Sequence, residues 1–184
     1  MVLDILDDGG PVGVAGFSLG GYTAAAVLGA RIDADVFGSI MNRQVVLPPP
    51  PEYPTLADEL AARLTADDVA EWVADSGRDY ADERICAGFL ICPAQAELIT
   101  DASLTAITAP VSIWWVGDDD QTPAETNALR YASLIPGATE HCADPAAGHY
   151  MFVKDLPGAD LIRTRVGTAA ADFFRDRLRR SPAS

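Results

Sequence analysis

A serine between two glycines is the first feature of the sequence that could perform chemistry. Residues 16–20 read Gly-Phe-Ser-Leu-Gly and fit the pattern G-x-S-x-G, with Ser18 at the centre. In this pattern the serine occupies a strained turn between a strand and a helix, and glycine is expected on both sides because the turn leaves little room for side chains. Ser18 is therefore a candidate nucleophile, and the backbone N–H of Leu19 is a candidate donor to an oxyanion. The alternative is a glycine-rich turn that holds an ordinary serine.

A serine nucleophile needs a general base, because its hydroxyl is a weak nucleophile at neutral pH. The sequence contains two histidines, His141 and His149. His141 falls inside an expected strand at 139–143, where a hydrogen-bonded structural role is the simpler interpretation. His149 follows the loop at 144–148, beyond the end of that strand, where functional side chains gather. Position therefore favours His149 as the base.

Three adjacent aspartates offer a carboxylate to orient the base. Asp118, Asp119 and Asp120 follow an expected strand at 111–116. A carboxylate next to the histidine holds its tautomer and stabilises the imidazolium. From position alone all three aspartates stay candidates. The triplet could instead bind a hard cation, but no ligand pattern such as an EF-hand loop surrounds it, so no metal site is expected.

The hydrophobic pattern predicts the elements that position these residues. Apolar runs at 12–17, 85–92 and 111–116 suit buried strands of a parallel sheet. Shorter or weaker runs suggest two more strands, at 139–143 and within 36–47. Helices are expected at 23–30, from a Thr-Pro-Ala-Glu capping box at 122–125, and at 161–179. The alternation of strands and helices predicts an α/β domain, with helices on both faces of a mostly parallel sheet.

A helical insertion is expected after a run of four prolines, which forms a stiff spacer. Thr55 and Thr65 each stand where they would cap a short helix. We interpret residues 52–78 as a helical cap near the site. Three aromatic residues could line a pocket, although packing in the core or cap is the simpler interpretation: Tyr53, Trp72 and Phe89.

Composition limits the class of protein. The 184 residues are 49% hydrophobic and 22% charged, as expected of one globular domain with a core. A net charge of −14 argues against nucleic acid or an anionic membrane as a partner. The three cysteines, Cys86, Cys92 and Cys142, contain no C-x-x-C pair, so neither disulfides nor zinc ligation is expected, and we interpret them as small buried apolar residues.

The first residues and the longest apolar runs bear on localisation. The N-terminal segment has no basic start, long apolar stretch or small-residue cleavage site, so no signal peptide is expected. No window holds the roughly 18 apolar residues of a membrane span. We expect a soluble, cytoplasmic protein.

Three segments, at 14–22, 117–123 and 147–152, resemble the catalytic segments of the α/β-hydrolase superfamily. The similarity runs from about residue 12 to residue 153 and is greatest to the predicted dienelactone hydrolase group, relatives of platelet-activating-factor acetylhydrolases that use serine. The resemblance implies a serine hydrolase that cleaves a small carboxylic ester or lactone through an acyl-enzyme, without a cofactor. In the family pattern G-x-x-D-x-x-P the acid stands three residues after the glycine, which implies Asp120, with Asp119 as the fallback.

The sequence departs from this family at its N-terminal side. The serine turn of the family follows the fifth strand of eight, whereas here it begins about ten residues from Met1. We therefore expect residues 1–184 to form a single α/β-hydrolase domain without its first four strands. The loop that supplies a second oxyanion N–H would be missing too, a loss on the order of 3 kcal/mol of transition-state stabilisation. The strand at 12–17 would have an apolar edge that favours pairing in a homodimer. The rival hypothesis is an inactive remnant that serves as an interaction module.

Overall fold

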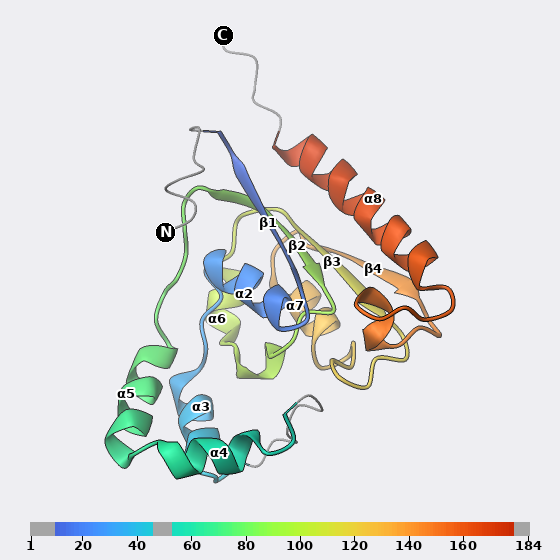
Figure 1. Cartoon of the computed structure of the whole chain (residues 1–184). Helices are drawn as coiled ribbons and strands as arrows, with labels where there is room; N and C mark the ends of the chain where they lie inside the picture. The colour runs from blue at the N-terminus through green and yellow to red at the C-terminus, as the bar shows by residue number, and fades with distance from the viewer. Residues whose placement is uncertain (1–9, 46–52, 179–184) are drawn as a thin grey trace.

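The computed structural model describes residues 10–45 and 53–178, and within them one sheet of four strands forms the centre (Figure 1). The strands are β1 (Val12–Phe17), β2 (Ile85–Ile91), β3 (Val111–Val116) and β4 (Thr139–Asp144), in that spatial order. All three pairs are parallel, so their carboxyl ends share one edge of the sheet. The predicted α/β class with a parallel sheet is confirmed.

Helices cover both faces of the sheet, because successive side chains of a strand point to opposite faces. In β2, Leu90 faces the core that is shared with α2 (Leu19–Val27), α6 (Asp101–Thr105) and α7 (Ala128–Leu134). Its neighbour Phe89 belongs to the other core, against α8 (Ala159–Arg177). Helix α8 lies along one face of the sheet (Figure 1). Strands β2 and β3 are largely buried on both faces, which explains why their sequences read as continuous apolar runs.

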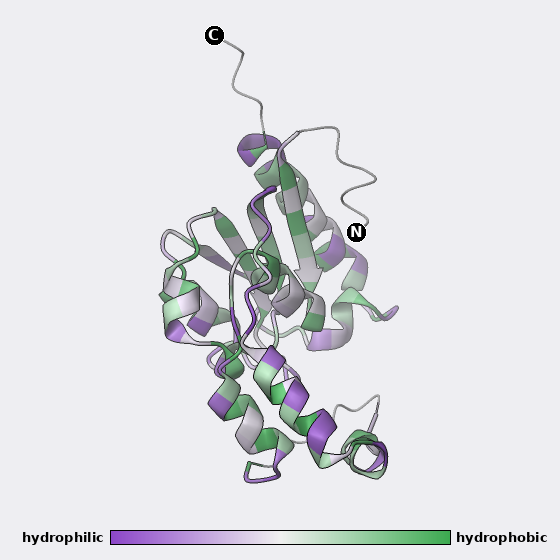
Figure 2. Ribbon diagram, turned by 90° about the vertical axis from the view of Figure 1, so that its left-hand side faces the viewer, coloured by the Kyte–Doolittle hydropathy of each residue, from purple (hydrophilic) through white to green (hydrophobic). Residues whose placement is uncertain are grey.

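Three further helices lie beside the sheet rather than on it: α3 (Ala34–Met41), α4 (Leu56–Arg63) and α5 (Ala66–Ser76) (Figure 1). Figure 2 shows hydrophilic and hydrophobic residues alternating along these helices, whereas strands β1, β2 and β3 consist mainly of hydrophobic residues. The two expected helices at 55–76 are present. Thr65 forms a capping box with Asp68, but the Thr55 side chain bonds Glu59 instead of the backbone. Assignment of residues 52–78 as an inserted cap stays a prediction.

The prediction of a strand within 36–47 is wrong for residues 36–45, which the structure describes and where α3 lies instead. The Asp33 side chain accepts hydrogen bonds from the N–H groups of Asp35 and Val36 and so caps the N-terminus of α3. A local cap of this kind favours helix over the weak strand preference of valine and phenylalanine. Residues 46–47 and the four prolines lie outside the described residues.

The cysteines are buried only in part, contrary to the sequence interpretation. Cys92 is buried and lies one residue beyond the end of β2, whereas Cys86 is exposed and Cys142 is intermediate. No helix in the described ranges is long and apolar enough to cross a membrane. In the described sheet β1 is an edge strand, paired to β2 alone. That it pairs with a second chain stays a prediction.

Candidate active site

Ser18 sits in a strained turn at the carboxyl end of β1. Its backbone has φ 56° and ψ −120°, a positive φ that is rare for a residue with a side chain. The Ser18 N–H donates to the Ile91 carbonyl at 2.9 Å, and the Ser18 carbonyl accepts from the Ala94 N–H at 3.1 Å. These bonds fix the turn against the end of β2. The strand, turn and helix expected around Ser18 are therefore present.

The turn requires glycine at position 16, as expected, but on the other side it requires glycine at position 21 rather than at position 20. A Cβ at Gly16 would lie 1.9 Å from the Gly20 carbonyl oxygen, so no side chain fits there. A Cβ at Gly20 would meet nothing within 4 Å. At Gly21 it would lie 2.8 Å from the Pro93 Cα. The turn therefore packs its own backbone against Gly16, while α2 packs against the segment after β2 through Gly21.

His149 lies beside Ser18, as the sequence predicts. It begins a short 3-10 helix, His149–Phe152, after the loop that follows β4, and it is 5% exposed. Its Nε2 lies 2.9 Å from the Ser18 Oγ. The Phe17 ring packs against the imidazole with 4.7 Å between centroids, which restricts its rotation. His141 lies in β4 instead, where it is exposed and its ring packs against Trp114.

The carboxylate that contacts His149 belongs to Asp119, which corrects the preference for Asp120. Asp119 Oδ2 lies 2.8 Å from His149 Nδ1, and the Asp119 side chain is 2% exposed. Asp118 and Asp120 are both exposed, and neither side chain is recorded with a hydrogen bond in the described structure. The fallback aspartate is thus the one that the fold turns inward.

Thr122 holds the Asp119 carboxylate, a role that the sequence did not reveal. Asp119 Oδ1 accepts from the N–H groups of Gln121 at 3.0 Å and Thr122 at 2.7 Å, and Oδ2 accepts from the Thr122 hydroxyl at 2.9 Å. The sequence predicted Thr122 as a helix cap, but α7 begins only at Ala128. A threonine three residues after an aspartate can form this turn, so the signal was present but was assigned to the helix.

These hydrogen bonds decide the charge of Asp119. Burial pushes the pKa of the carboxyl upward, because a buried charge is poorly solvated. The hydrogen bonds from His149 and Thr122 push it downward and prevail, so the pKa of Asp119 lies below its ordinary value. Asp119 is therefore ionised at neutral pH, and its carboxylate can accept a hydrogen bond from His149 Nδ1 when that nitrogen carries the proton.

Backbone contacts between two loops fix the distance from Asp119 to His149. The N–H of Gly117 donates to the Asp144 carbonyl at 2.9 Å, and the N–H of Asp118 donates to the Ala147 carbonyl at 3.0 Å. A Cβ at Gly117 would lie 2.3 Å from the Pro145 carbonyl oxygen. The loops after β3 and β4 are therefore in direct backbone contact, which requires glycine at position 117.

The Leu19 N–H lies at a helix end, and its role as an oxyanion donor stays a prediction. Leu19 is the first residue of α2, so its N–H has no acceptor within the helix. No hydrogen bond from this N–H is recorded in the described ranges, and the Leu19 side chain is 58% exposed. The N–H group is thus available to an anion at the helix N-terminus, where the helix dipole also favours negative charge.

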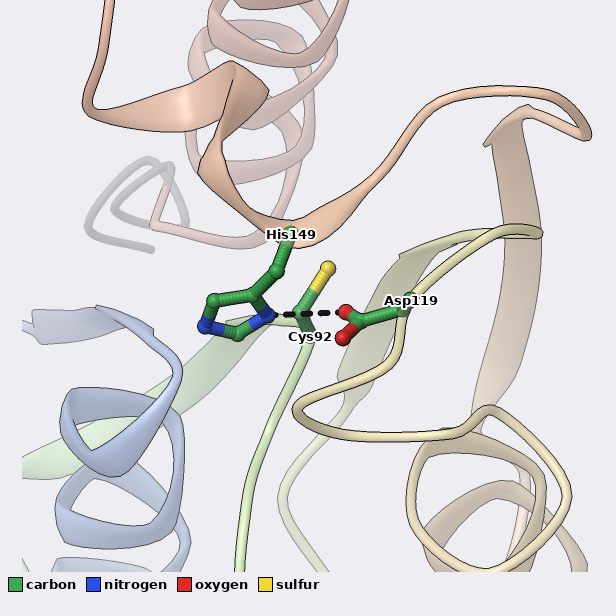
Figure 3. A group of neighbouring side chains, drawn as sticks. All are labelled: Cys92, Asp119 and His149. Atoms are coloured by element: carbon green, nitrogen blue, oxygen red, sulfur yellow. Dashed lines mark hydrogen bonds and ion pairs between the residues drawn. The ribbon is translucent and has the colours of Figure 1, made fainter. Parts of the chain in front are cut away.

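A buried thiol adjoins the histidine and the aspartate (Figure 3). Cys92 Sγ, a carboxylate oxygen of Asp119 and a ring nitrogen of His149 all lie within 4.8 Å of one another. Burial, followed by the negative charge of Asp119, strongly raises the pKa of the Cys92 thiol, so the thiol is protonated. The sequence predicts Cys92 only as a small apolar residue, because nothing in its local sequence indicates a neighbouring carboxylate.

A separate cavity of about 720 Å³ lies among α2, α3, α5 and the segment after α5. Its lining includes Tyr22, Phe37, Trp72 and Tyr80. Of the three aromatic residues considered from sequence, Trp72 thus lines a cavity, Phe89 is buried in the core and Tyr53 is exposed.

Comparisons with known proteins bear on the fold. Neither a protein-family model nor a curated protein sequence matches the chain. Among solved structures, an acylaminoacyl peptidase in complex with a chloromethyl ketone is 12% identical, with a TM-score of 0.55 over 100% of this chain and 26% of that one. An acetyl ester-xyloside bifunctional hydrolase from Caldicellulosiruptor lactoaceticus is 16% identical, with a TM-score of 0.48 over 89% of this chain and 56% of that one.

A meta-cleavage product hydrolase from Pseudomonas fluorescens is 13% identical, with a TM-score of 0.42 over 93% of this chain and 68% of that one. These proteins are α/β-hydrolases, and the chain has a partial α/β-hydrolase fold. It spans about a quarter of the peptidase chain. The comparisons do not distinguish the dienelactone hydrolase group from other branches of the superfamily.

Proposed function

We propose that the protein is a serine hydrolase in which Ser18, His149 and Asp119 form a catalytic triad. The observation that carries the proposal is a continuous chain of hydrogen-bonding contacts, 2.8 Å from Asp119 to His149 Nδ1 and 2.9 Å from His149 Nε2 to the Ser18 Oγ. A nucleophile, a base and an orienting acid at hydrogen-bond distance are the geometry that acyl transfer requires.

The proton positions follow from the donors and acceptors. An ionised carboxylate only accepts, so the proton of a neutral His149 resides on Nδ1 and leaves Nε2 free to accept. As the Ser18 Oγ bonds to the substrate carbonyl carbon, its proton passes to Nε2, and the resulting imidazolium is stabilised by Asp119. His149 then protonates the leaving oxygen, and water deacylates the enzyme by the same route in reverse. The Leu19 N–H stabilises the oxyanion.

For the substrate we propose a small, uncharged carboxylic ester or lactone, with chemistry of the dienelactone hydrolase type and no cofactor. The resemblance of the three motif segments supports this class. The net charge of −14 also disfavours anionic substrates by long-range repulsion. Comparing p-nitrophenyl acetate and butyrate with the corresponding p-nitroanilides tests the class, because hydrolysis of the anilides at a similar rate would contradict an ester preference.

The triad itself is tested by labelling the purified chain with a fluorophosphonate, which reacts only with an activated serine. We expect labelling of the native protein, none of Ser18→Ala, and strong loss in His149→Ala and Asp119→Asn. Asp120→Asn is the matched control and is expected to label normally. A folded native chain that does not label would contradict the proposal.

The second candidate is a binding role for the β1 edge. Because β1 is paired on one side only in the described sheet, we propose that a second copy of the chain can pair there. Light scattering of the purified chain measures its mass directly. A dimer that dissociates in Val14→Lys would support pairing at β1, and a monomer at high concentration would contradict it.

A further inference from the structure

Three metal-binding atoms of different chemistry meet behind the nucleophile (Figure 3). They are Cys92 Sγ, a carboxylate oxygen of Asp119 and a ring nitrogen of His149, all within 4.8 Å of one another. The three residues follow the carboxyl ends of β2, β3 and β4 and are buried. We propose that this cluster also binds a thiophilic divalent cation such as Zn²⁺, and that the bound cation switches the hydrolase off. The inhibition rests on the proposed function, whereas cation binding does not.

The geometry requires only small movements. Three atoms at most 4.8 Å apart lie within about 2.8 Å of a shared centre, and zinc bonds measure about 2.0–2.3 Å, so the donor atoms lie within about 1 Å of bonding distance. His149 Nδ1 and Asp119 Oδ2, now 2.8 Å apart, give up their mutual hydrogen bond and separate as they bind the cation. Sulfur, imidazole nitrogen and carboxylate oxygen together favour zinc over magnesium or calcium. The Thr122 Oγ1, 3.3 Å from His149 Nδ1, is positioned to be a fourth donor.

Charge balance favours a cation with two positive charges. The site offers one carboxylate, on Asp119, and one thiol, on Cys92. A Zn²⁺ ion ionises a thiol that it coordinates, and the proton of the thiol leaves to solvent. The thiolate and the carboxylate then neutralise the cation. A buried site without net charge avoids the large cost of burying an unpaired charge.

The cation would disable the base without contacting Ser18. Once Nδ1 coordinates the metal, it carries no proton, so a neutral His149 holds its proton on Nε2. Nε2 faces the Ser18 Oγ at 2.9 Å. In this tautomer Nε2 can only donate, so it cannot remove the serine proton. The metal also separates His149 from the Asp119 carboxylate that stabilises the imidazolium.

Cation binding is tested first, with Co²⁺ as the probe, because a cobalt–thiolate bond absorbs in the near ultraviolet. We expect the band in the native chain at about one equivalent of Co²⁺, and equally in the control Cys142→Ser, whose thiol lies outside the cluster. In Cys92→Ser and Cys92→Ala the band should vanish, and Co²⁺ affinity should fall by at least about 100-fold. Thermal unfolding without metal verifies that each variant is folded. A band that persists in both Cys92 variants, or no band in the native chain at millimolar Co²⁺, would overturn the proposal.

Inhibition is tested with Zn²⁺ and the fluorophosphonate, each variant being compared with its own metal-free labelling. Zn²⁺ should block labelling of the native chain and of Cys142→Ser, and a chelator should restore it. Equal inhibition of the Cys92 variants would refute the assigned site. If no folded variant labels without metal, the hydrolase proposal fails, and the Co²⁺ titration still decides the cation site.

Discussion

Replacing Asp119 by asparagine is the sharpest test of the geometry, because the change preserves shape and reverses one hydrogen bond. The amide oxygen can still accept from the Gln121 and Thr122 N–H groups that now bond Asp119 Oδ1. The NH₂ group then takes the place of Oδ2 and points its hydrogens at His149 Nδ1. Nδ1 must accept, so the imidazole proton moves to Nε2, where it blocks removal of the Ser18 proton.

The expected loss follows from this inversion. A wrongly held tautomer removes both the base and the stabilisation of the imidazolium, which costs about 10³–10⁴-fold in kcat, or roughly 4–5.5 kcal/mol of transition-state stabilisation. KM should change little, because no substrate contact is altered. In Asp120→Asn, whose side chain is exposed, both constants should stay within about twofold of the native values.

The assay is steady-state hydrolysis of p-nitrophenyl acetate, with chemical denaturation to verify that each variant is folded. A folded Asp119→Asn that retains more than about a tenth of the native kcat would refute the argument. A comparable loss in Asp120→Asn would do so too, and would show that the acid is selected by something other than the contact at 2.8 Å.

Four further outcomes follow from the same contacts. Gly16→Ala should reduce the folded yield or cost about 3 kcal/mol or more on denaturation, because its Cβ would meet backbone, while Gly20→Ala should change stability by less than about 1 kcal/mol; equal effects would contradict this turn geometry. Gly117→Ala should lower both kcat and stability, because the backbone of the loop after β4 occupies the space that the new Cβ would need. An active, stable variant would be evidence against the contact between the two loops. Thr122→Val should lower kcat by about tenfold with normal folding, by loss of one hydrogen bond to the carboxylate, and an unchanged kcat would show that the hydroxyl is dispensable. The pKa of Asp119 is lower in the folded chain than in the unfolded chain, where it is near 4, so its stabilising contribution is complete above about pH 4 and disappears as the pH falls through the folded pKa. In urea titrations the difference in unfolding free energy between the native chain and Asp119→Asn should therefore narrow below about pH 4. A difference that stays constant with pH would contradict the lowered pKa of Asp119.

Most of the sheet was predictable because three of its strands are apolar runs, and two of these, β2 and β3, are largely buried on both faces. Continuous apolar runs gave β1 and β3 their bounds to the residue and β2 to within one residue. Helices cover both faces of a parallel sheet, so a strand inside such a sheet is apolar along its whole length. The prediction for the segment of α3 was wrong because its apolar residues also suit a strand. The hydrogen bonds that decide for a helix are the few local ones that the Asp33 side chain accepts.

The proposed nucleophile and base were predictable for a different reason. Ser18 directly follows β1, and His149 follows the loop after β4, whereas the other histidine, His141, lies inside β4. The proposed acid was not predictable, because Asp118, Asp119 and Asp120 are equivalent in sequence. Which aspartate turns inward depends on backbone bonds to residues 144–147, which belong to another loop. Spacing within one loop does not determine such a register, and a family pattern transferred by spacing gave Asp120.

The hydrogen bonds of the proposed triad also bear on the rival hypothesis of an inactive remnant. Ser18 is fixed by the end of β2, and the Asp119 carboxylate by Gln121 and Thr122. Every one of these partners lies in the described residues on β1 to β4 or in the loops at their carboxyl ends. A site that depended on contacts across the open edge of β1 would lack some of its hydrogen-bonding partners here, whereas the serine, histidine and aspartate have theirs. We therefore expect a covering chain at β1 to alter stability and oxyanion binding more than the alignment of the triad.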